Sequence, residues 1–168
     1  MILLVTKRII EIIMEIKFFF DLEETLITDW HDPLLCNVQK VKKWIADNGV
    51  KQAGIFSWAV WNQADVDVFN KTLKTWLEGV FEIEFIEVIT KNDAVRAVCF
   101  AKSLRCVDMT DVIDIASVFG KHGIFTEWCL ATKRDCICVL LDDVVPDRII
   151  TDKVTGVTVK LVNVDRLS

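Results

Sequence analysis

Histidine is scarce in this sequence, and long apolar runs are missing from it. The 168 residues include only His31 and His122, which are too few for a histidine-based metal centre. The apolar fraction is high, at 52%. Even so, no apolar run approaches the roughly 18 residues that a membrane-spanning helix requires. We therefore expect one globular domain with a sizeable core and no membrane association.

The sequence also lacks a dense cluster of basic residues. Its 20 lysines and arginines are outnumbered by 25 aspartates and glutamates, which gives a net charge of −5. The densest basic group consists of Lys40, Lys42 and Lys43, and it is typical of the solvated face of one helix. Because binding to a nucleic-acid backbone depends on positive charge, we expect no direct binding of that kind.

Residues 1–13 form a leader that precedes the main pattern of the chain. Lys7 and Arg8 follow the apolar run Met1–Val5, whereas a secretory signal has its basic residues first. This order predicts a cytoplasmic protein. The leader itself fits either an amphipathic helix or an extra strand. A further hypothesis is that Met14 is the natural first residue, so that the domain spans 14–168.

Most of the six cysteines lie inside apolar segments, where a thiol behaves as a small hydrophobe. Cys136 and Cys138 alternate along an expected strand, so their sulfur atoms should share one face. A metal pair is conceivable there, but no second Cys or His pair stands at a spacing typical of zinc sites. Reduced thiols in the core are the preferred interpretation.

Strand and helix patterns alternate along the whole chain. Five strands are predicted, over 15–20, 53–57, 81–89, 136–141 and 157–164, with helical patterns between them. The fourth strand is apolar throughout, as expected of a central strand that is covered on both faces. This alternation predicts an α/β fold, specifically a three-layer, Rossmann-like domain with a mainly parallel five-stranded sheet.

Capping and breaking residues set the expected ends of the helices. Pro suits the first helical position, and Gly can take the left-handed conformation that ends a helix. The expected starts are Asp32–Pro33, Asn62 and Thr90, and the expected ends are Gly49, Gly79 and Gly120. In the first helix, one buried stripe is predicted at Leu34, Val38, Val41 and Ile45.

Two of the predicted strands run directly into carboxylates. Asp21 follows the first strand, and Asp142 and Asp143 follow the fourth. If these strands are neighbours in a parallel sheet, their acids meet at one edge. Like charges there raise one another's pKa, and Mg²⁺ relieves the conflict because it binds carboxylate oxygens and retains waters for a phosphate. The pattern predicts metal-assisted phosphoryl chemistry with an aspartate nucleophile.

Four short motifs of this sequence resemble those of the haloacid dehalogenase-like superfamily of phosphohydrolases, and they follow one another in the same order as in that family. The resemblance covers about Met14–Val164. The matching segments and residues are Phe18–Leu26 for the first motif, Ser57 for the second, Lys121 for the third and Val139–Asp143 for the fourth. It implies a domain of that family over 14–168, in which the segment 90–120 is a candidate small helical cap.

The resemblance also implies a role for each matching residue. Asp21 would attack phosphorus and form an aspartyl-phosphate, while Ser57 and Lys121 would hold the transferring oxygens. Glu23 would act as general acid and base. The Mg²⁺ ligands, direct or through water, would be Asp21, Glu23, Asp142 and Asp143. Positioning and charge stabilisation of this kind supply most of the catalysis in phosphoryl transfer.

Glu23 is the departure from the family pattern, which usually has Asp at this position. Glu can perform the same proton chemistry, but its extra methylene moves the carboxylate by about 1.5 Å. A misplacement on the order of 1 Å can cost about a hundredfold in rate. The leading prediction is a Mg²⁺-dependent phosphatase for a small phosphomonoester, with a nucleotide as one candidate. The alternative is a catalytically impaired domain that acts as a protein-interaction module, with exposed tryptophans as anchors.

Each candidate residue also has an ordinary structural interpretation. Asp21 taken alone fits a polar turn after a strand, and Ser57 fits a hydroxyl at a strand end. Lys121 also fits a cation at a helix end. Lys91 is its rival as the third-motif residue, but Lys121 precedes Asp142 by one helix and one strand, which is the more suitable separation.

Trp30 and His31 lie where the family places a mobile flap. They are candidates for contact with substrate, and a tryptophan that packs against the core is an equally good interpretation. The sequence does not distinguish these two roles.

Overall fold

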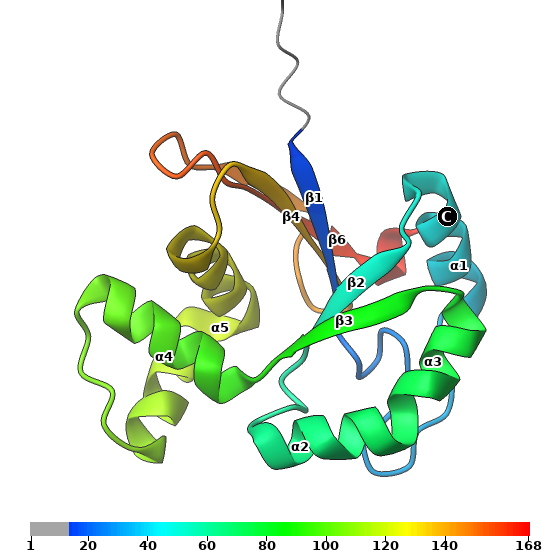
Figure 1. Cartoon of the computed structure of the whole chain (residues 1–168), viewed down its shortest axis with the longest axis horizontal. Coiled ribbons are helices and arrows are strands. Elements are labelled where there is room, and N and C mark those ends of the chain that lie inside the picture. The colour runs from blue at the N-terminus through cyan, green and yellow to red at the C-terminus, as the bar shows by residue number, and fades with distance from the viewer. Residues whose placement is uncertain (1–13) are drawn as a thin grey trace, which may run out of the picture.

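The computed structural model describes residues 14–168, which form one mixed sheet with helices on both faces (Figure 1). The predicted leader, residues 1–13, lies outside the described residues. In chain order the elements are β1 (Glu15–Phe20), α1 (Val38–Asn48), β2 (Gln52–Phe56), α2 (Gln63–Val68), the π-helix η1 (Phe69–Leu73), α3 (Lys74–Phe81), β3 (Glu84–Ile89), α4 (Lys91–Lys102), α5 (Met109–Thr132), β4 (Cys136–Asp142), β5 (Arg148–Thr151), β6 (Thr158–Asn163) and the 3₁₀-helix η2 (Val164–Arg166).

The strand order in the sheet is β3-β2-β1-β4-β6-β5, and every neighbouring pair except β5 and β6 is parallel. The last residue of β1, Phe20, is in register with Ile55 of β2 and Leu141 of β4. The chain proceeds from β1 to β2 and β3 on one side, and then β4 pairs with the other side of β1. This reversal is the type of switch point at which open α/β sheets bind ligands.

The prediction of a mainly parallel α/β sheet is confirmed, but the predicted number of five strands is wrong. The sixth strand is β5, which pairs antiparallel with β6 at the edge of the sheet. It has four residues, and Ile149 within it is 66% exposed. Such a short, exposed edge strand carries no alternating apolar pattern, so the sequence alone gives little sign of it.

Neighbouring phenylalanines of β1 serve the two faces of the sheet. Phe20 packs on one face in a cluster with residues of α1, η1 and α3, whereas Phe19 packs on the other with residues of α4 and α5. On that second face, the ring of Phe125 lies 5.4 Å from Phe19 and 4.9 Å from Phe56, between ring centroids. Figure 1 shows the helical layers on the two faces of the sheet, and each cluster joins one layer to the sheet.

The first helix starts later than the sequence predicts. Its first residue is Val38 instead of a residue next to Pro33, and Leu34, predicted as buried, is 64% exposed. The reason is that the backbone of this segment pairs with the loop after β1. The N–H of Thr28 donates to the carbonyl of Leu34, and the N–H of Cys36 donates to that of Leu26. The predicted end is confirmed, since Gly49 follows the helix with a φ of 64°.

The boundary between α3 and β3 also differs from the prediction. Gly79 does not end the helix, which continues to Phe81. The cap is Glu82, whose φ is 57° and whose N–H donates to the carbonyl of Glu78. Phe81 is therefore buried as a helical residue and does not begin the strand. At the other end, Asn62 caps the preceding helix as predicted, through its side chain.

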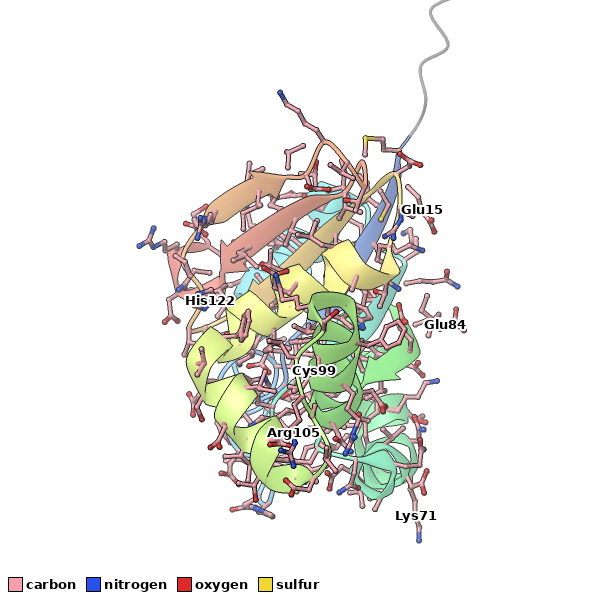
Figure 2. The ribbon with its side chains drawn as sticks, turned by 90° about the vertical axis from the view of Figure 1, so that its left-hand side faces the viewer. Glu15, Lys71, Glu84, Cys99, Arg105 and His122 are labelled. Atoms are coloured by element: carbon pink, nitrogen blue, oxygen red, sulfur yellow. The ribbon has the colours of Figure 1, made fainter. Side chains whose placement is uncertain are left out.

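The segment 90–120 consists of α4 and the first half of α5. Thr90 caps α4, and Gly120 interrupts α5 with a φ of 68°, both as predicted. Figure 2 shows α4 packed along α5, and Lys102 of α4 pairs with Glu127 of α5 at 2.8 Å. Buried side chains of α4 belong to the same cluster as Phe19 of the sheet. Within residues 14–168, no helix combines the length and apolar character needed to cross a bilayer.

All six cysteines are free thiols, and four of them are buried. Cys136 and Cys138 share one face of β4, and their sulfur atoms are 3.8 Å apart. Cys129 of α5 belongs to the same apolar cluster. The predicted location of cysteines within the core is confirmed for these four residues.

Candidate active site

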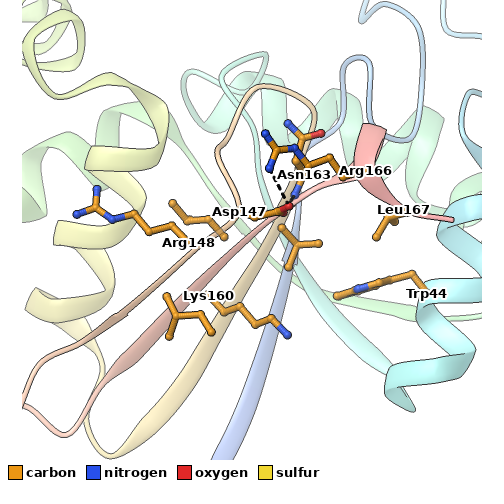
Figure 3. A pocket seen from close by; sticks show the side chains of 10 residues that line it. Trp44, Asp147, Arg148, Lys160, Asn163, Arg166 and Leu167 are labelled. Atoms are coloured by element: carbon orange, nitrogen blue, oxygen red, sulfur yellow. Dashed lines mark hydrogen bonds and ion pairs between the residues drawn. The ribbon is translucent and has the colours of Figure 1, made fainter.

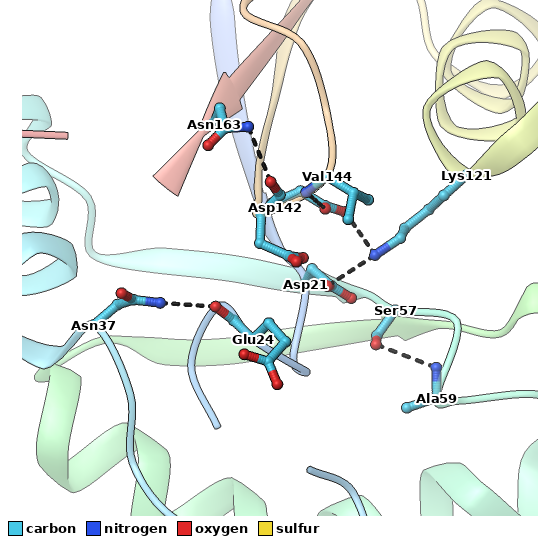
Figure 4. Close-up of polar contacts among 10 residues, drawn as sticks. Asp21, Glu24, Asn37, Ser57, Ala59, Lys121, Asp142, Val144 and Asn163 are labelled. Carbon is cyan, nitrogen blue, oxygen red and sulfur yellow. Dashed lines mark hydrogen bonds and ion pairs between the residues drawn. The ribbon is translucent and has the colours of Figure 1, made fainter. Parts of the chain in front are cut away.

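Three adjacent strands deliver polar side chains to one edge of the sheet. Asp21 follows β1, Ser57 follows β2, and Asp142 is the last residue of β4. Because β1 lies between β2 and β4, these side chains come together at the carboxyl ends of the strands (Figure 4). All three are almost fully buried, with exposed fractions of 1%, 2% and 0%.

The carboxylates of Asp21, Asp142 and Asp143 form a compact acidic group. Each offers one oxygen, and the three oxygens lie within 4.8 Å of one another. Two backbone contacts hold the group together. The N–H of Asp21 donates to the carbonyl of Leu141 at 3.0 Å, and Asp142 Oδ1 accepts from the N–H of Val144 at 2.9 Å.

Lys121 is the cation that faces this group. Its Nζ donates to Asp21 Oδ2 at 2.8 Å and lies 2.9 Å from Asp142 Oδ2 (Figure 4). The side chain is only 13% exposed. The break at Gly120 begins a new helical half with Lys121, which is how the lysine reaches the edge of the sheet. Burial opposes the ammonium form, but the charges of Asp21 and Asp142 outweigh it and raise the pKa of Lys121.

The acidic group carries more charge than Lys121 can balance. Burial, and then the charge of Asp142, raise the pKa of Asp21 to about 7, against the opposing effects of Lys121 and Ser57. Burial and Asp142 likewise raise the pKa of Asp143. When all three carboxylates are ionised, Lys121 balances one of them and two negative charges remain, which one divalent cation would neutralise.

Two buried oxygens of the group, Asp21 Oδ1 and Asp142 Oδ2, accept no hydrogen bond within the described residues, but Asp142 Oδ2 is paired with the Lys121 ammonium. Asp21 Oδ1 makes no hydrogen bond within the described residues, although Oδ2 of the same carboxylate is bound by Lys121. Carboxylate oxygens are the ligands that Mg²⁺ and Ca²⁺ prefer. The donor set, the unbalanced charge and the free oxygen therefore all fit a hard divalent cation.

Ser57 contributes a hydroxyl at the end of β2. Its Oγ accepts a hydrogen bond from the N–H of Ala59 at 3.3 Å, and its carbonyl accepts from the N–H of Val60 at 3.2 Å. These bonds define a tight turn directly after the strand. The hydroxyl also lowers the pKa of Asp21, although less than burial raises it.

Glu23 lies outside the acidic group. Its Oε1 accepts a hydrogen bond from the N–H of Trp30 at 3.0 Å, and the residue is half-buried. The structure thus brings Asp21, Asp142 and Asp143 together but turns Glu23 toward the loop that follows.

Lys91, the rival of Lys121, contacts aromatic rings instead of carboxylates. Its Nζ lies 4.2 Å from the ring centroid of Trp58 and 3.8 Å from that of Trp61. The residue is 8% exposed, and burial lowers its pKa. Of the two candidate lysines, only Lys121 faces the acids.

Two asparagines form hydrogen bonds to the loops of the site, and the sequence did not predict this role for either of them. Asn37 Nδ2 donates to the carbonyl of Glu24 at 2.7 Å, where the loop after β1 has a φ of 58°. Asn163 Nδ2 donates to the carbonyls of Asp143 and Val145, at 2.9 and 2.8 Å. Asn163 ends β6 at the same edge of the sheet, so its position was a usable signal. Asn37 has no comparable local signal.

Two open cavities of comparable size lie outside the acidic group. One, of about 560 Å³, is lined by Trp44, Lys160, Asn163, Arg166 and their neighbours (Figure 3). The other, of about 620 Å³, lies between Trp30 and His31 of the loop after β1 and Trp76 of α3. The two residues predicted as a flap thus line a cavity, and Trp30 also packs against the core.

Comparison with models of known protein families, with curated proteins and with solved structures found no significant match. Family membership therefore stays a prediction that rests on the motifs. Function has to be inferred from the geometry and charge of the site.

Proposed function

We propose that the protein is a Mg²⁺-dependent phosphohydrolase of the haloacid dehalogenase-like superfamily. Its substrate would be a small phosphomonoester, with a nucleotide as one candidate, and the reaction would pass through an aspartyl-phosphate on Asp21. The observation that carries this proposal is the acidic group of Asp21, Asp142 and Asp143 with Lys121 between two of its members. Its place at the switch point of the sheet supports the same conclusion.

The acidic group supplies the proposed metal ligands. Asp21, Asp142 and Asp143 would hold Mg²⁺, directly or through water, and their unbalanced charge favours a divalent ion. The bound ion would polarise a phosphoryl oxygen as a Lewis acid. Glu23, which the resemblance implies as a further ligand, is outside the group in this structure, so it is left out of the ligand set.

The chemistry would proceed in two displacements at phosphorus. First, a carboxylate oxygen of Asp21 would attack, the phosphorus–oxygen ester bond would break, and the leaving oxygen would take a proton from Oε2 of Glu23, since Oε1 accepts from Trp30. A water molecule then attacks the phosphorus of the aspartyl-phosphate and gives its proton back to Glu23. Inorganic phosphate leaves, and the Asp21 carboxylate is restored.

Lys121 and Ser57 would stabilise the transferring group. Each offers a hydrogen-bond donor beside Asp21, and donors fixed before the reaction stabilise charge without reorganisation. In a buried site these interactions are stronger than in water. The burial of Asp21 and Ser57 is therefore part of the support for this role.

The test is hydrolysis of a generic aryl phosphate by purified protein, with Mg²⁺ or with a chelator. Wild-type protein should turn over only with the metal. Asp21→Asn should lose on the order of 10³-fold or more in kcat. The matched control is Asp47→Asn, because Asp47 pairs with Lys43 on the exposed side of α1. Turnover that survives Asp21→Asn would overturn the proposal.

A second candidate function follows from Glu23. Because its carboxylate is bound by the N–H of Trp30, the domain could lack a working acid and serve as a protein-interaction module. Three exposed apolar residues would suit such a role. Leu34 follows Trp30 in the chain, and Val68 and Trp76 line the same cavity as Trp30. This function predicts that Mg²⁺ binds to the acidic group while no member of a panel of phosphomonoesters is hydrolysed.

A further inference from the structure

Lys91 is a buried cation whose close contacts are two indole rings. Its Nζ lies over both Trp58 and Trp61, and burial lowers its pKa. A cation over the face of an aromatic ring is attracted by the negative charge of that face, and tryptophan gives the strongest attraction. Lys91 therefore draws together two side chains of one short turn.

That turn is the one that carries Ser57. It runs from Ser57 to Trp61, and its internal bonds join the N–H groups of Ala59 and Val60 to the Oγ and carbonyl of Ser57. The first residues of α4 close it from outside. The N–H of Lys91 donates to the carbonyl of Val60 at 2.8 Å, and the N–H of Asn92 donates to that of Trp61 at 3.2 Å.

The ring of Trp58 lacks a polar contact at its edge among the described residues. The indole Nε1 of Trp58 is buried and has no hydrogen-bond partner within the described residues, so no polar contact at the ring edge fixes it. The ring packs against the apolar cluster that contains Phe56, and its polar contact is the one between the ring face and the Lys91 ammonium. Backbone bonds hold the carbonyls of the turn, while Lys91 holds its side chains.

We propose that Lys91 is a positioning residue, whose ammonium, held between Trp58 and Trp61, fixes the turn that presents the Ser57 hydroxyl at the reaction site. The inference rests on the proposed function, because Ser57 matters for catalysis only if a phosphoryl group binds beside Asp21. It also gives the rival of Lys121 a separate role. One lysine faces the carboxylates, and the other supports the serine.

The first experiment needs no activity. Amide hydrogen exchange at Ala59 and Val60 is measured in wild-type protein, Lys91→Met and Lys91→Arg. The matched control is Lys133→Met, because Lys133 lies 4.7 Å from the ring centroid of Trp128, away from the turn. Lys91→Met should speed exchange at these amides by at least about tenfold. Lys91→Arg should restore protection, and Lys133→Met should leave it unchanged. Full protection in Lys91→Met would overturn the inference.

The second experiment asks whether Lys91 acts through Ser57. Lys91→Met should lower kcat/KM for an aryl phosphate by about 10- to 100-fold, as expected for a small misplacement of a catalytic group. In the Ser57→Ala background the same change should have no further effect. Additive losses would contradict a role through Ser57.

The two experiments distinguish failure of the proposed function from failure of the inference about Lys91. A wild-type protein that hydrolyses no phosphate overturns the proposed function, and the exchange result then decides by itself whether Lys91 fixes the turn. If Lys91→Met does not fold, Trp61→Phe replaces it, since a phenyl ring attracts a cation less than an indole does. Faster exchange at Ala59 in that variant would support the inference, and unchanged exchange would contradict it.

Discussion

Lys121 Nζ lies 2.8 Å from Asp21 Oδ2, although one hundred positions separate the two residues along the chain. This contact joins the end of the central strand β1 to the second half of α5. Since Asp142 lies 2.9 Å from the same ammonium, one lysine links the ends of two neighbouring strands. Both carboxylates are buried, so the link is sensitive to the loss of either partner.

Removal of the lysine charge should destabilise the metal-free protein. Lys121→Met leaves two buried carboxylates without a cation, and such changes cost about 3–5 kcal/mol in free energy of unfolding. Urea unfolding in a chelator measures the loss, and saturating Mg²⁺ should recover part of it. The control is Lys43→Met, whose exposed pair with Asp47 should contribute no more than about 1 kcal/mol. Equal losses in both variants would contradict the role of Lys121.

The raised pKa of Asp21 predicts how stability depends on pH in a chelator. A carboxyl group with a pKa of about 7 when folded, against an ordinary 3.8, binds more protons in the folded state between these values. The contribution of Asp21 to the unfolding free energy should therefore fall as the pH rises through this window. Asp21→Asn lacks the titrating group, so its advantage in unfolding free energy should grow from about pH 4 to pH 7.

Urea unfolding of wild-type protein and Asp21→Asn at several pH values shows directly whether the difference in their unfolding free energies grows or shrinks with pH. Saturating Mg²⁺ should remove the advantage of the variant, because the ion stabilises the ionised carboxylate. A wild-type protein that gains on Asp21→Asn as the pH rises in a chelator would show that the pKa of Asp21 is not raised.

Glu23→Gln should separate the catalytic role of Glu23 from its structural one. The amide oxygen of glutamine can still accept from the N–H of Trp30, so the melting temperature should change little. Loss of the acid should lower kcat by about 10²- to 10⁴-fold, the usual contribution of general acid–base catalysis. Steady-state kinetics and thermal melts measure the two effects. Full turnover in this variant would exclude Glu23 as the acid.

The substitution Gly54→Ala should disturb the core beneath the site. An added Cβ would lie 2.6 Å from two ring carbons of Phe19 and 3.0 Å from Glu87 Cγ. Overpacking of this kind costs about 1–3 kcal/mol in unfolding free energy. Gly79→Ala is the matched control, because nothing lies within 4 Å of its Cβ and alanine favours a helix by about 1 kcal/mol. Denaturant unfolding should therefore give opposite signs for the two variants.

The parts of the site that could be predicted from the sequence depend on local patterns. An apolar strand that runs into acids is visible at Asp21 and at Asp142, and parallel pairing then brings their ends together. Gly120 marks the helix break that begins the half carrying Lys121. These features need only neighbouring residues and the rule that parallel strands end at one edge.

The features that could not be predicted depend on contacts between distant segments. The late start of α1 follows from backbone bonds between Thr28 and Leu34, which no local propensity encodes. The orientation of Glu23 follows from its bond to Trp30. The strand β5 exists because β6 offers it a free edge. In each case tertiary pairing decides between local alternatives.

The central claim is that Asp21 attacks phosphorus. The most direct measurement is rapid acid quenching of the protein during turnover of a phosphomonoester with Mg²⁺, followed by mass spectrometry of its peptides. We predict a phosphoryl group on the side chain of Asp21, present in Lys121→Met at lower occupancy and absent in Asp21→Asn. Turnover with the phosphoryl group on another residue, or with no phosphorylated residue under conditions that trap acyl phosphates, would contradict the claim.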